Sequence, residues 1–224
     1  MKICEIFKSL QGEGPNQGLP TIFLRLQGCN LTCKWCDTKY AQGDSDDSFE
    51  CIPEEVANKI AEITAFPKRV CITGGEPGVQ IQSLHILVDL LVDMGYDVSI
   101  ETNGSFSNSY MPQCPLIIDY KLPSSGMQDS FDDSNFVDVG ENDWLKMVIA
   151  TKNDLNYIIL NDIIGRAQVK YKNRIILSII DKTHIEGSDN ISLKELAEWV
   201  MNHGFDVRIQ KQLHKLIWSD ERGK

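Results

Sequence analysis

Three cysteines lie within eight residues of this sequence: Cys29, Cys33 and Cys36, with the spacing C-x3-C-x2-C. Three thiolates on one tight loop can hold three irons of a cuboidal 4Fe–4S cluster and leave the fourth iron open to another ligand. A zinc site completed by a distant histidine such as His214 is the alternative. A second C-x2-C pair, which a structural zinc ribbon would usually supply, is absent from the sequence.

The remaining cysteines are isolated in the sequence, and we expect them to be small core residues: Cys4, Cys51, Cys71 and Cys114. The total of seven is odd, so a full set of disulfides is not possible. The first residues lack the features of a secretion signal, and no apolar run approaches the roughly 18 residues of a membrane span. We therefore expect a cytoplasmic protein with reduced thiols.

Composition limits the function classes. The 224 residues include 22 Lys and Arg against 32 Asp and Glu, a net charge of −10. Such a surface repels phosphate backbones and disfavours nucleic acid as a partner. The length and the hydrophobic content of 42% predict a single domain over residues 1–224 with a core that needs no disulfides.

Short apolar segments alternate with amphipathic ones along the chain. Strands are predicted at 21–26, 69–73, 97–101, 116–120, 144–150, 174–180 and 206–209. Helices are predicted at 53–64, 81–94, 153–164, where Gly165 would end the helix, and from a capping box at 192–195 to about residue 204. This alternation predicts an α/β fold with parallel strands, as a full or partial barrel or as a doubly wound sheet. The polar, acidic segment 123–142 is predicted to be an irregular surface loop.

A second motif, Gly74-Gly75-Glu76-Pro77, follows the next strand after the cysteine loop at 28–38. With the cysteines, it resembles the radical S-adenosylmethionine superfamily. The resemblance implies a partial or modified (β/α) TIM-like barrel. It also implies that the open iron binds the amino and carboxylate groups of S-adenosylmethionine, which is cleaved to a 5′-deoxyadenosyl radical.

Further motifs lie at residues 5–14, 23–29, 36–38, 101–104 and 212–215. Together they resemble the family of 7-carboxy-7-deazaguanine synthases, carbon–nitrogen lyases of 7-deazapurine and queuosine biosynthesis. The resemblance implies conversion of 6-carboxy-5,6,7,8-tetrahydropterin to 7-carboxy-7-deazaguanine with loss of ammonia. It also implies a magnesium ion, a flavodoxin-like reductant and a homodimer.

The same resemblance implies roles for individual residues. The residues expected to bind substrate are Leu10, Gln11, Gly12, Glu13, Arg25, Thr73, Gln212 and His214. Those expected to contact S-adenosylmethionine are Trp35, Cys36, Asp37, Gly75, Glu76, Thr102, Asn103 and Lys121. Thr38 is expected to bind magnesium through its hydroxyl, which suits a hard cation. Arg25 lies inside an apolar run, where an unpaired charge is costly, so we expect its guanidinium to face a carboxylate or pterin acceptor.

One motif departs from the family pattern. Relatives often carry Ser-Pro-Lys where this sequence has Asp119-Tyr120-Lys121, so Lys121 keeps its expected role while Asp119 and Tyr120 have none assigned. Two alternative functions are a glycyl-radical-enzyme activase and a non-enzymatic zinc or iron–sulfur binding module. The Gln11-Gly-Glu-Gly and Cys36-Asp-Thr38 motifs favour the synthase.

Overall fold

The computed structural model describes residues 1–63, 66–180, 189–219 and 221–223. Its centre is a nine-stranded sheet in the order β3-β1-β2-β4-β5-β6-β7-β8-β9. The strands are β1 (Lys2–Leu10), β2 (Pro20–Leu26), β3 (Phe49–Glu50), β4 (Arg69–Gly74), β5 (Asp97–Thr102), β6 (Leu116–Asp119), β7 (Trp144–Ile149), β8 (Ile175–Ile179) and β9 (Arg208–Lys211). Neighbours from β2 to β9 are parallel, and β1 pairs antiparallel with β2 and β3.

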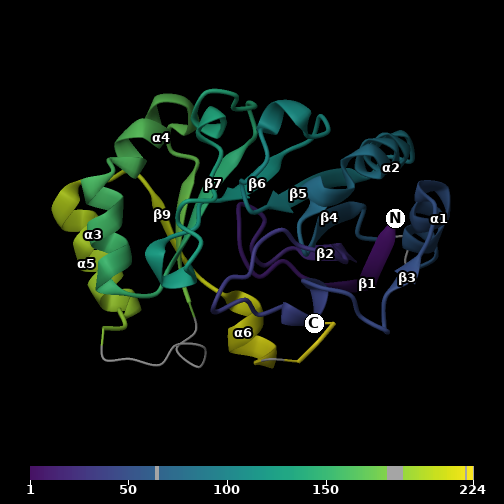
Figure 1. The fold of residues 1–224 in the computed structure, drawn as a ribbon, viewed down its shortest axis with the longest axis horizontal. Helices are drawn as coiled ribbons and strands as arrows, with labels where there is room; N and C mark the ends of the chain where they lie inside the picture. The colour runs from purple at the N-terminus through teal and green to yellow at the C-terminus, as the bar shows by residue number, and fades with distance from the viewer. Residues whose placement is uncertain (64–65, 181–188, 220, 224) are drawn as a thin grey trace.

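Most helices follow the outer side of the curved sheet, while α6 lies below the strands near the C-terminus (Figure 1). The helices are α1 (Pro53–Ile63), α2 (Ile81–Asp93), α3 (Lys152–Leu160), α4 (Ile163–Tyr171), α5 (Leu193–His203) and α6 (Leu213–Trp218). Short 3-10 turns are η1 (Lys39–Ala41), η2 (Pro77–Gln80), η3 (Asn108–Tyr110), η4 (Pro123–Ser125) and η5 (Asp133–Phe136). The predicted capping box of α5 is present, with Ser192 and Glu195 bonded reciprocally.

The sheet forms a partial barrel, as predicted from the resemblance. Its edge strands, β3 and β9, form no ladder with each other in the described residues. The loop that follows β1 reaches across the opening instead. Gly14 N donates to Gln210 Oε1 at 2.9 Å, Gln210 Nε2 donates to Gly14 O at 2.7 Å, and Leu213 N donates to Gly12 O at 3.0 Å. The start of the chain is thereby tied to β9 and α6.

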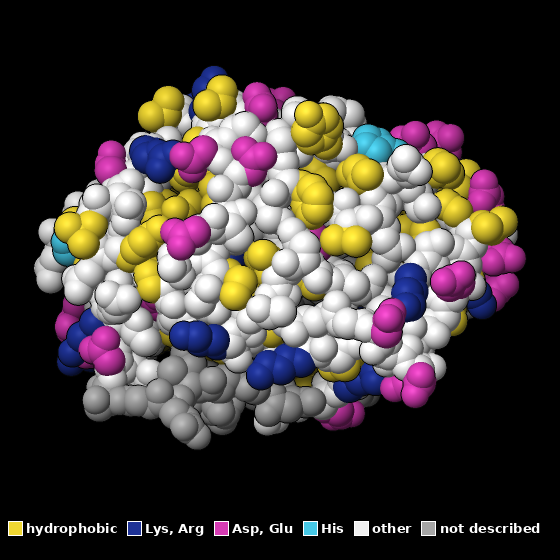
Figure 2. Space-filling view, viewed as in Figure 1, with side chains coloured by type: hydrophobic (Ala, Val, Ile, Leu, Met, Phe, Trp, Pro, Cys, Tyr) yellow, Lys and Arg dark blue, Asp and Glu magenta, His cyan; other side chains and the backbone are white. Residues whose placement is uncertain are grey.

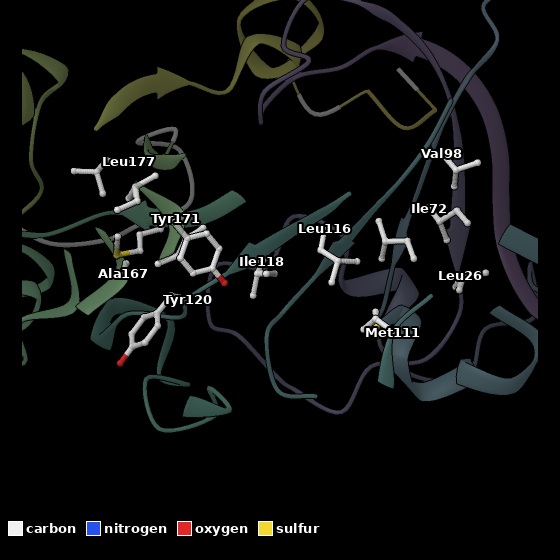
Figure 3. Close-up of a cluster of buried hydrophobic side chains, with 14 of the residues drawn as sticks. Leu26, Ile72, Val98, Met111, Leu116, Ile118, Tyr120, Ala167, Tyr171 and Leu177 are labelled. Atoms are coloured by element: carbon white, nitrogen blue, oxygen red, sulfur yellow. The ribbon is translucent and has the colours of Figure 1, made fainter. Parts of the chain in front are cut away.

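The core lies between the sheet and its outer helices. Leu26, Ile72 and Val98 come from neighbouring strands and point into one apolar layer (Figure 3). Tyr120 and Tyr171 lie in the same cluster farther along the sheet. Because strand side chains alternate between faces, this leaves the opposite face of each strand free to line the barrel interior.

The prediction of one helix over 153–164 is wrong. Two helices lie in this region, and the chain turns between them at Asp162, which has a left-handed φ of 47°. Gly165 belongs to the first turn of α4 rather than ending a helix, and a Cβ at this position would lie 2.3 Å from Asp162 Oδ1. The glycine therefore makes room for the side chain of the turn that precedes it.

The prediction that 123–142 is a surface loop is also wrong in part. The segment has no α-helix or strand, but Asn135 and Phe136 are buried. Asn135 Nδ2 donates to the carbonyls of Gly104 and Phe106, each at 3.0 Å, and the Phe136 ring packs 5.1 Å from Phe131. Side-chain hydrogen bonds satisfy buried backbone groups here in place of regular structure, so no hydrophobic period is required.

Acidic side chains gather over α1 and α2 at the right of the face in Figure 2. Basic side chains lie mainly along the lower part of the same face. No helix in the described part of the chain has the length and hydropathy needed to cross a membrane.

Candidate active site

A cavity opens at the carboxyl ends of the parallel strands, where barrel enzymes place their chemistry. About 1290 Å³ of space there is free of protein atoms, part of it open to solvent. The cavity brings together every residue singled out from the sequence. They are Leu10, Gln11, Gly12, Glu13, Arg25, Cys29, Cys33, Trp35, Cys36, Asp37, Thr38, Thr73, Gly75, Glu76, Thr102, Asn103, Lys121, Gln212 and His214.

The cysteine loop follows β2 and is held at both ends. Cys29 N donates to Gln42 O at 2.9 Å, which closes the base of the loop. Lys34 N donates to Ser125 O at 3.0 Å, and Trp35 Nε1 donates to Ser124 Oγ at 3.1 Å. The segment 123–126 therefore supports the cysteine loop through these hydrogen bonds.

All three loop cysteines are free thiols that line the cavity. Burial raises the pKa of Cys29 and Cys33, and the ammonium of Lys121 opposes this rise. The described residues contain no group of three His, Cys, Asp or Glu side chains gathered around one metal ion. In a 4Fe–4S cluster each thiolate binds a different iron, so convergence on one point is not required and the donor set fits the cluster.

Gly74 and Gly75 allow the end of β4 to touch the end of β2. Gly74 has a φ of +130°, and a Cβ there would lie 2.2 Å from the backbone nitrogen of Leu26. A Cβ on Gly75 would lie 1.8 Å from the carbonyl oxygen of Gly28. Only glycine permits this contact, which brings the Gly-Gly-Glu segment beside the cysteine loop.

Glu76 joins this segment to the end of β5. It is fully buried, and its carboxylate accepts hydrogen bonds from Gly78 N (2.9 Å), Thr102 Oγ1 (2.8 Å) and Asn103 N (2.7 Å). Burial raises the pKa of Glu76 despite these donors. Asn103 Nδ2 continues the network to Asn30 Oδ1 at 2.9 Å, inside the cysteine loop. The motif residues thus fix one another before any ligand binds.

Arg25 forms an ion pair with Glu5, which is not among the site residues predicted from the sequence. Its Nε donates to Glu5 Oε1 at 2.7 Å, and both side chains are about 15% exposed or less. The Tyr40 hydroxyl donates to the same oxygen at 3.0 Å. Asp37 lies nearby, 3.9 Å from His214 Nε2. Burial opposes its ionisation, but His214 and Arg25 hold the pKa of Asp37 well below its ordinary value.

Gln11 and Thr73 meet at a second missed residue, Glu101. Gln11 Nε2 donates to Glu101 Oε1 at 3.0 Å, and Thr73 Oγ1 donates to Glu101 Oε2 at 3.1 Å. Glu101 begins the Glu-Thr-Asn-Gly motif, which could have signalled it, and it lines the cavity. Together, the three side chains form a polar part of the cavity lining.

Four buried side chains of alternating charge form a row of ion pairs in the cavity lining: Glu13, Lys146, Asp119 and Lys121. Lys146 Nζ lies 3.1 Å from Glu13 Oε2 and 3.5 Å from Asp119 Oδ2, and Lys121 Nζ lies 3.0 Å from the same Asp119 oxygen. Burial acts against the charges of Glu13, Lys121 and Lys146, yet Lys146 and Ser178 hold the pKa of Glu13 below its ordinary value, and the carboxylates raise the pKa of Lys146. Lys146 and Asp119 were also missed because only strand register brings them together.

Thr38 begins the η1 turn, but its side chain makes no capping hydrogen bond. Its hydroxyl lies 3.6 Å from Cys36 Sγ and faces the cavity. A hydroxyl beside the cysteine loop that is not needed for a cap fits an oxygen ligand for a magnesium ion.

Comparisons with known proteins agree with this geometry. The radical SAM superfamily model matches residues 24–121. A 7-carboxy-7-deazaguanine synthase of Methanospirillum hungatei is 37% identical over 97% of this chain and 85% of its own length. One from Thermoplasma acidophilum is 37% identical over the full length of both chains. In fold, the chain is similar to the crystal structure of QueE from Escherichia coli, with a TM-score of 0.69, 24% identity and coverage of 95% and 94% of the two chains.

The partial barrel, the three-cysteine loop and the Gly-Gly-Glu contact define a radical S-adenosylmethionine enzyme. The full-length similarity is more specific. The chain belongs to the 7-carboxy-7-deazaguanine synthase family. Neither the activase nor the zinc-binding module is favoured by these relatives.

Proposed function

We propose that this chain converts 6-carboxy-5,6,7,8-tetrahydropterin to 7-carboxy-7-deazaguanine with loss of ammonia, as a carbon–nitrogen lyase of 7-deazapurine and queuosine biosynthesis. The observation that carries the proposal is one cavity lined by two kinds of residue. Three free thiols and the Gly-Gly-Glu segment are called its first wall, and the cluster around Glu101 together with Arg25 is called its second wall. Full-length similarity to synthases supports the assignment.

Cys29, Cys33 and Cys36 would hold a 4Fe–4S cluster, which together with S-adenosylmethionine would supply the radical chemistry that removes a hydrogen atom from C6 of the pterin. The protein's own role is to position S-adenosylmethionine and the pterin relative to each other. Glu76 accepts three internal hydrogen bonds, and a carboxylate has about four acceptor positions, so one is left for an ammonium group. Lys121 supplies a charge for a carboxylate.

The rest of the first wall is proposed to contact S-adenosylmethionine through Trp35, Cys36, Asp37, Gly75, Thr102 and Asn103. On the second wall, the fixed fork of Arg25 suits the pterin carboxylate, and Thr38 suits a magnesium ion that shares it. Gln11 and Thr73, held by Glu101, offer polar groups to the pterin ring. The substrate site is proposed to be completed by Leu10, Gly12, Glu13, Gln212 and His214.

We further propose a single domain, a homodimer, a flavodoxin-like reductant and a cytoplasmic location. The seven free thiols support a reducing compartment, where disulfides are rare. The net charge of −10 disfavours nucleic acid as a partner.

An anaerobic assay with carboxytetrahydropterin, S-adenosylmethionine, magnesium and a reductant tests the reaction. We expect a carboxylated deazapurine and ammonia in equal amounts. Cleavage of S-adenosylmethionine only in the presence of a glycyl-radical partner protein would establish the activase instead. Cys33→Ala should lose iron and activity together. Cys114→Ala is the matched control, because burial raises the pKa of Cys114 to about 12 and it lies outside the cavity lining.

A further inference from the structure

Asp119 occupies the middle of the buried charge chain formed by Glu13, Lys146, Asp119 and Lys121. Its Oδ2 lies 3.0 Å from Lys121 Nζ and 3.5 Å from Lys146 Nζ. The side chains of Asp119, Lys121 and Lys146 are 14%, 12% and 9% exposed. One carboxylate therefore neutralises two buried ammonium groups.

Strand geometry explains this arrangement. Asp119 and Lys146 are directly opposite each other in the parallel β6–β7 pair, so their side chains share a face. Lys121 follows Asp119 by two residues and lines the same cavity. Tyr120, between them, points to the other face, where its ring packs 4.5 Å from Phe131. Asp119 thus places a charge on the cavity side, and Tyr120 places an aromatic ring on the core side.

The two lysines reach different halves of the cavity. Lys121 lies over the Trp35 ring at 5.6 Å and acts electrostatically on Cys29 and Cys33, so it faces the cysteine loop. Lys146 lies against Glu13 and acts on Glu101, which holds Gln11 and Thr73. Among the residues that the structure describes, Asp119 forms ion pairs with both Lys121 and Lys146.

The two oxygens of this carboxylate have different surroundings. Asp119 Oδ2 faces both lysines, whereas Asp119 Oδ1 is buried and has no hydrogen-bond donor in the described part of the chain. A buried carboxylate oxygen without a donor is unfavourable, so the favourable contacts of this carboxylate are those with the lysines. Its described partners are the two lysines, so its effect is exerted through them.

We propose that Asp119 is a positioning residue that fixes Lys121 toward the S-adenosylmethionine carboxylate and Lys146 toward the pterin half of the cavity. This inference rests on the proposed function. Without the shared carboxylate, two ammonium groups would repel each other across a space that one oxygen now fills. Each would move away from its ligand, and a displacement of about 1 Å can lower a rate by roughly 10²-fold.

The test compares Asp119→Asn and Asp119→Ser with wild type and with Asp93→Asn, a surface change on α2. Calorimetry with S-adenosylmethionine alone on cluster-loaded protein measures cofactor affinity, and steady-state assays measure KM for the pterin. We expect each Asp119 variant to weaken both by about tenfold or more, up to roughly 10²-fold in kcat/KM. The serine variant keeps the comparison valid if the asparagine variant does not fold.

Double variants show whether the effect passes through the lysines. In a Lys146→Met background, Asp119→Asn should no longer change the pterin KM, and in a Lys121→Met background it should no longer change cofactor affinity. Wild-type values in both Asp119 variants, or losses that persist in both lysine backgrounds, would overturn the inference. Inactive wild-type protein would instead contradict the proposed function itself.

Discussion

The Glu5 carboxylate holds the Arg25 guanidinium at 2.7 Å, at the place where the antiparallel β1–β2 pair enters the cavity. Tyr40 and Arg222 also bind Glu5. The Tyr40 hydroxyl lies 3.0 Å from Glu5 Oε1, and Arg222 Nε lies 3.2 Å from Glu5 Oε2. Both carboxylate oxygens are therefore occupied, and the guanidinium plane of Arg25 is set before a substrate arrives.

Glu5→Gln should release Arg25 from this position. Removing one charge of a buried pair leaves the other poorly compensated, so we expect a loss of about 1–3 kcal/mol in the free energy of unfolding and about a tenfold fall in kcat/KM for the pterin. Denaturant unfolding and steady-state kinetics measure the two effects. Glu62→Gln, an exposed change on α1, is the control. Unchanged kinetics in the Glu5 variant would show that Arg25 is held by other contacts.

Glu13 predicts a pH dependence of stability. Its pKa in the folded protein is below the ordinary value of 4.5, because Lys146 and Ser178 outweigh burial. A depressed carboxyl pKa stabilises the fold at pH values above about 4.5, and this contribution is lost as the pH falls through the folded pKa. Glu13→Gln should therefore be less stable than wild type at pH 7, and the difference should shrink below pH 4.5. Thermal unfolding across this range checks it, with Glu141→Gln as a surface control; a constant difference would contradict the linkage.

Gly12 is predicted to accept a side chain only if His214 moves. A Cβ at this position would lie 1.8 Å from His214 Nδ1, although the backbone itself is not in the left-handed region. Gly12→Ala should cost about 1–3 kcal/mol of stability through overpacking. Adding His214→Ala should restore stability without restoring activity. A double variant that stays as unstable as Gly12→Ala would place the strain elsewhere.

Thr38 should set the magnesium dependence of turnover. Thr38→Ala should keep the iron content and S-adenosylmethionine affinity of wild type while raising the magnesium concentration needed for half-maximal rate. Thr38→Ser keeps the oxygen and should be milder. Magnesium titrations of the three proteins decide this. Superimposable curves would leave Thr38 without a role in metal binding.

Several elements could be predicted from the sequence because their signals are local. The apolar run before Cys29 and the capping box at Ser192 need only neighbouring residues to act. Strand β1 was missed. A register shift between Ile3 and Glu5 interrupts its alternation, and its side chains are divided among core, cavity and solvent. Helix α6 was missed as well: it has only 6 residues, fewer than two turns, so a helical period cannot be recognised in it.

The residues of the candidate site also fall into those with a local sequence signal and those without one. The cavity residues named in advance lie in contiguous motifs. Many of these residues are in loops at strand ends, while Arg25 and Thr73 lie inside β2 and β4. Glu5, Lys146 and Asp119 act through partners on other strands, and pairing such residues requires the register of β1–β2 and β6–β7. A charged residue inside an apolar strand, such as Lys146 in β7, is the signal that could have found them.

Transfer of a labelled hydrogen tests the central claim most directly. Cluster-loaded protein would be mixed anaerobically with S-adenosylmethionine, magnesium, a reductant and carboxytetrahydropterin deuterated at C6. Mass spectrometry of the 5′-deoxyadenosine from a single turnover then reports the origin of its new hydrogen. The account predicts deuterium in 5′-deoxyadenosine together with 7-carboxy-7-deazaguanine and ammonia. Unlabelled 5′-deoxyadenosine with unchanged pterin would contradict it.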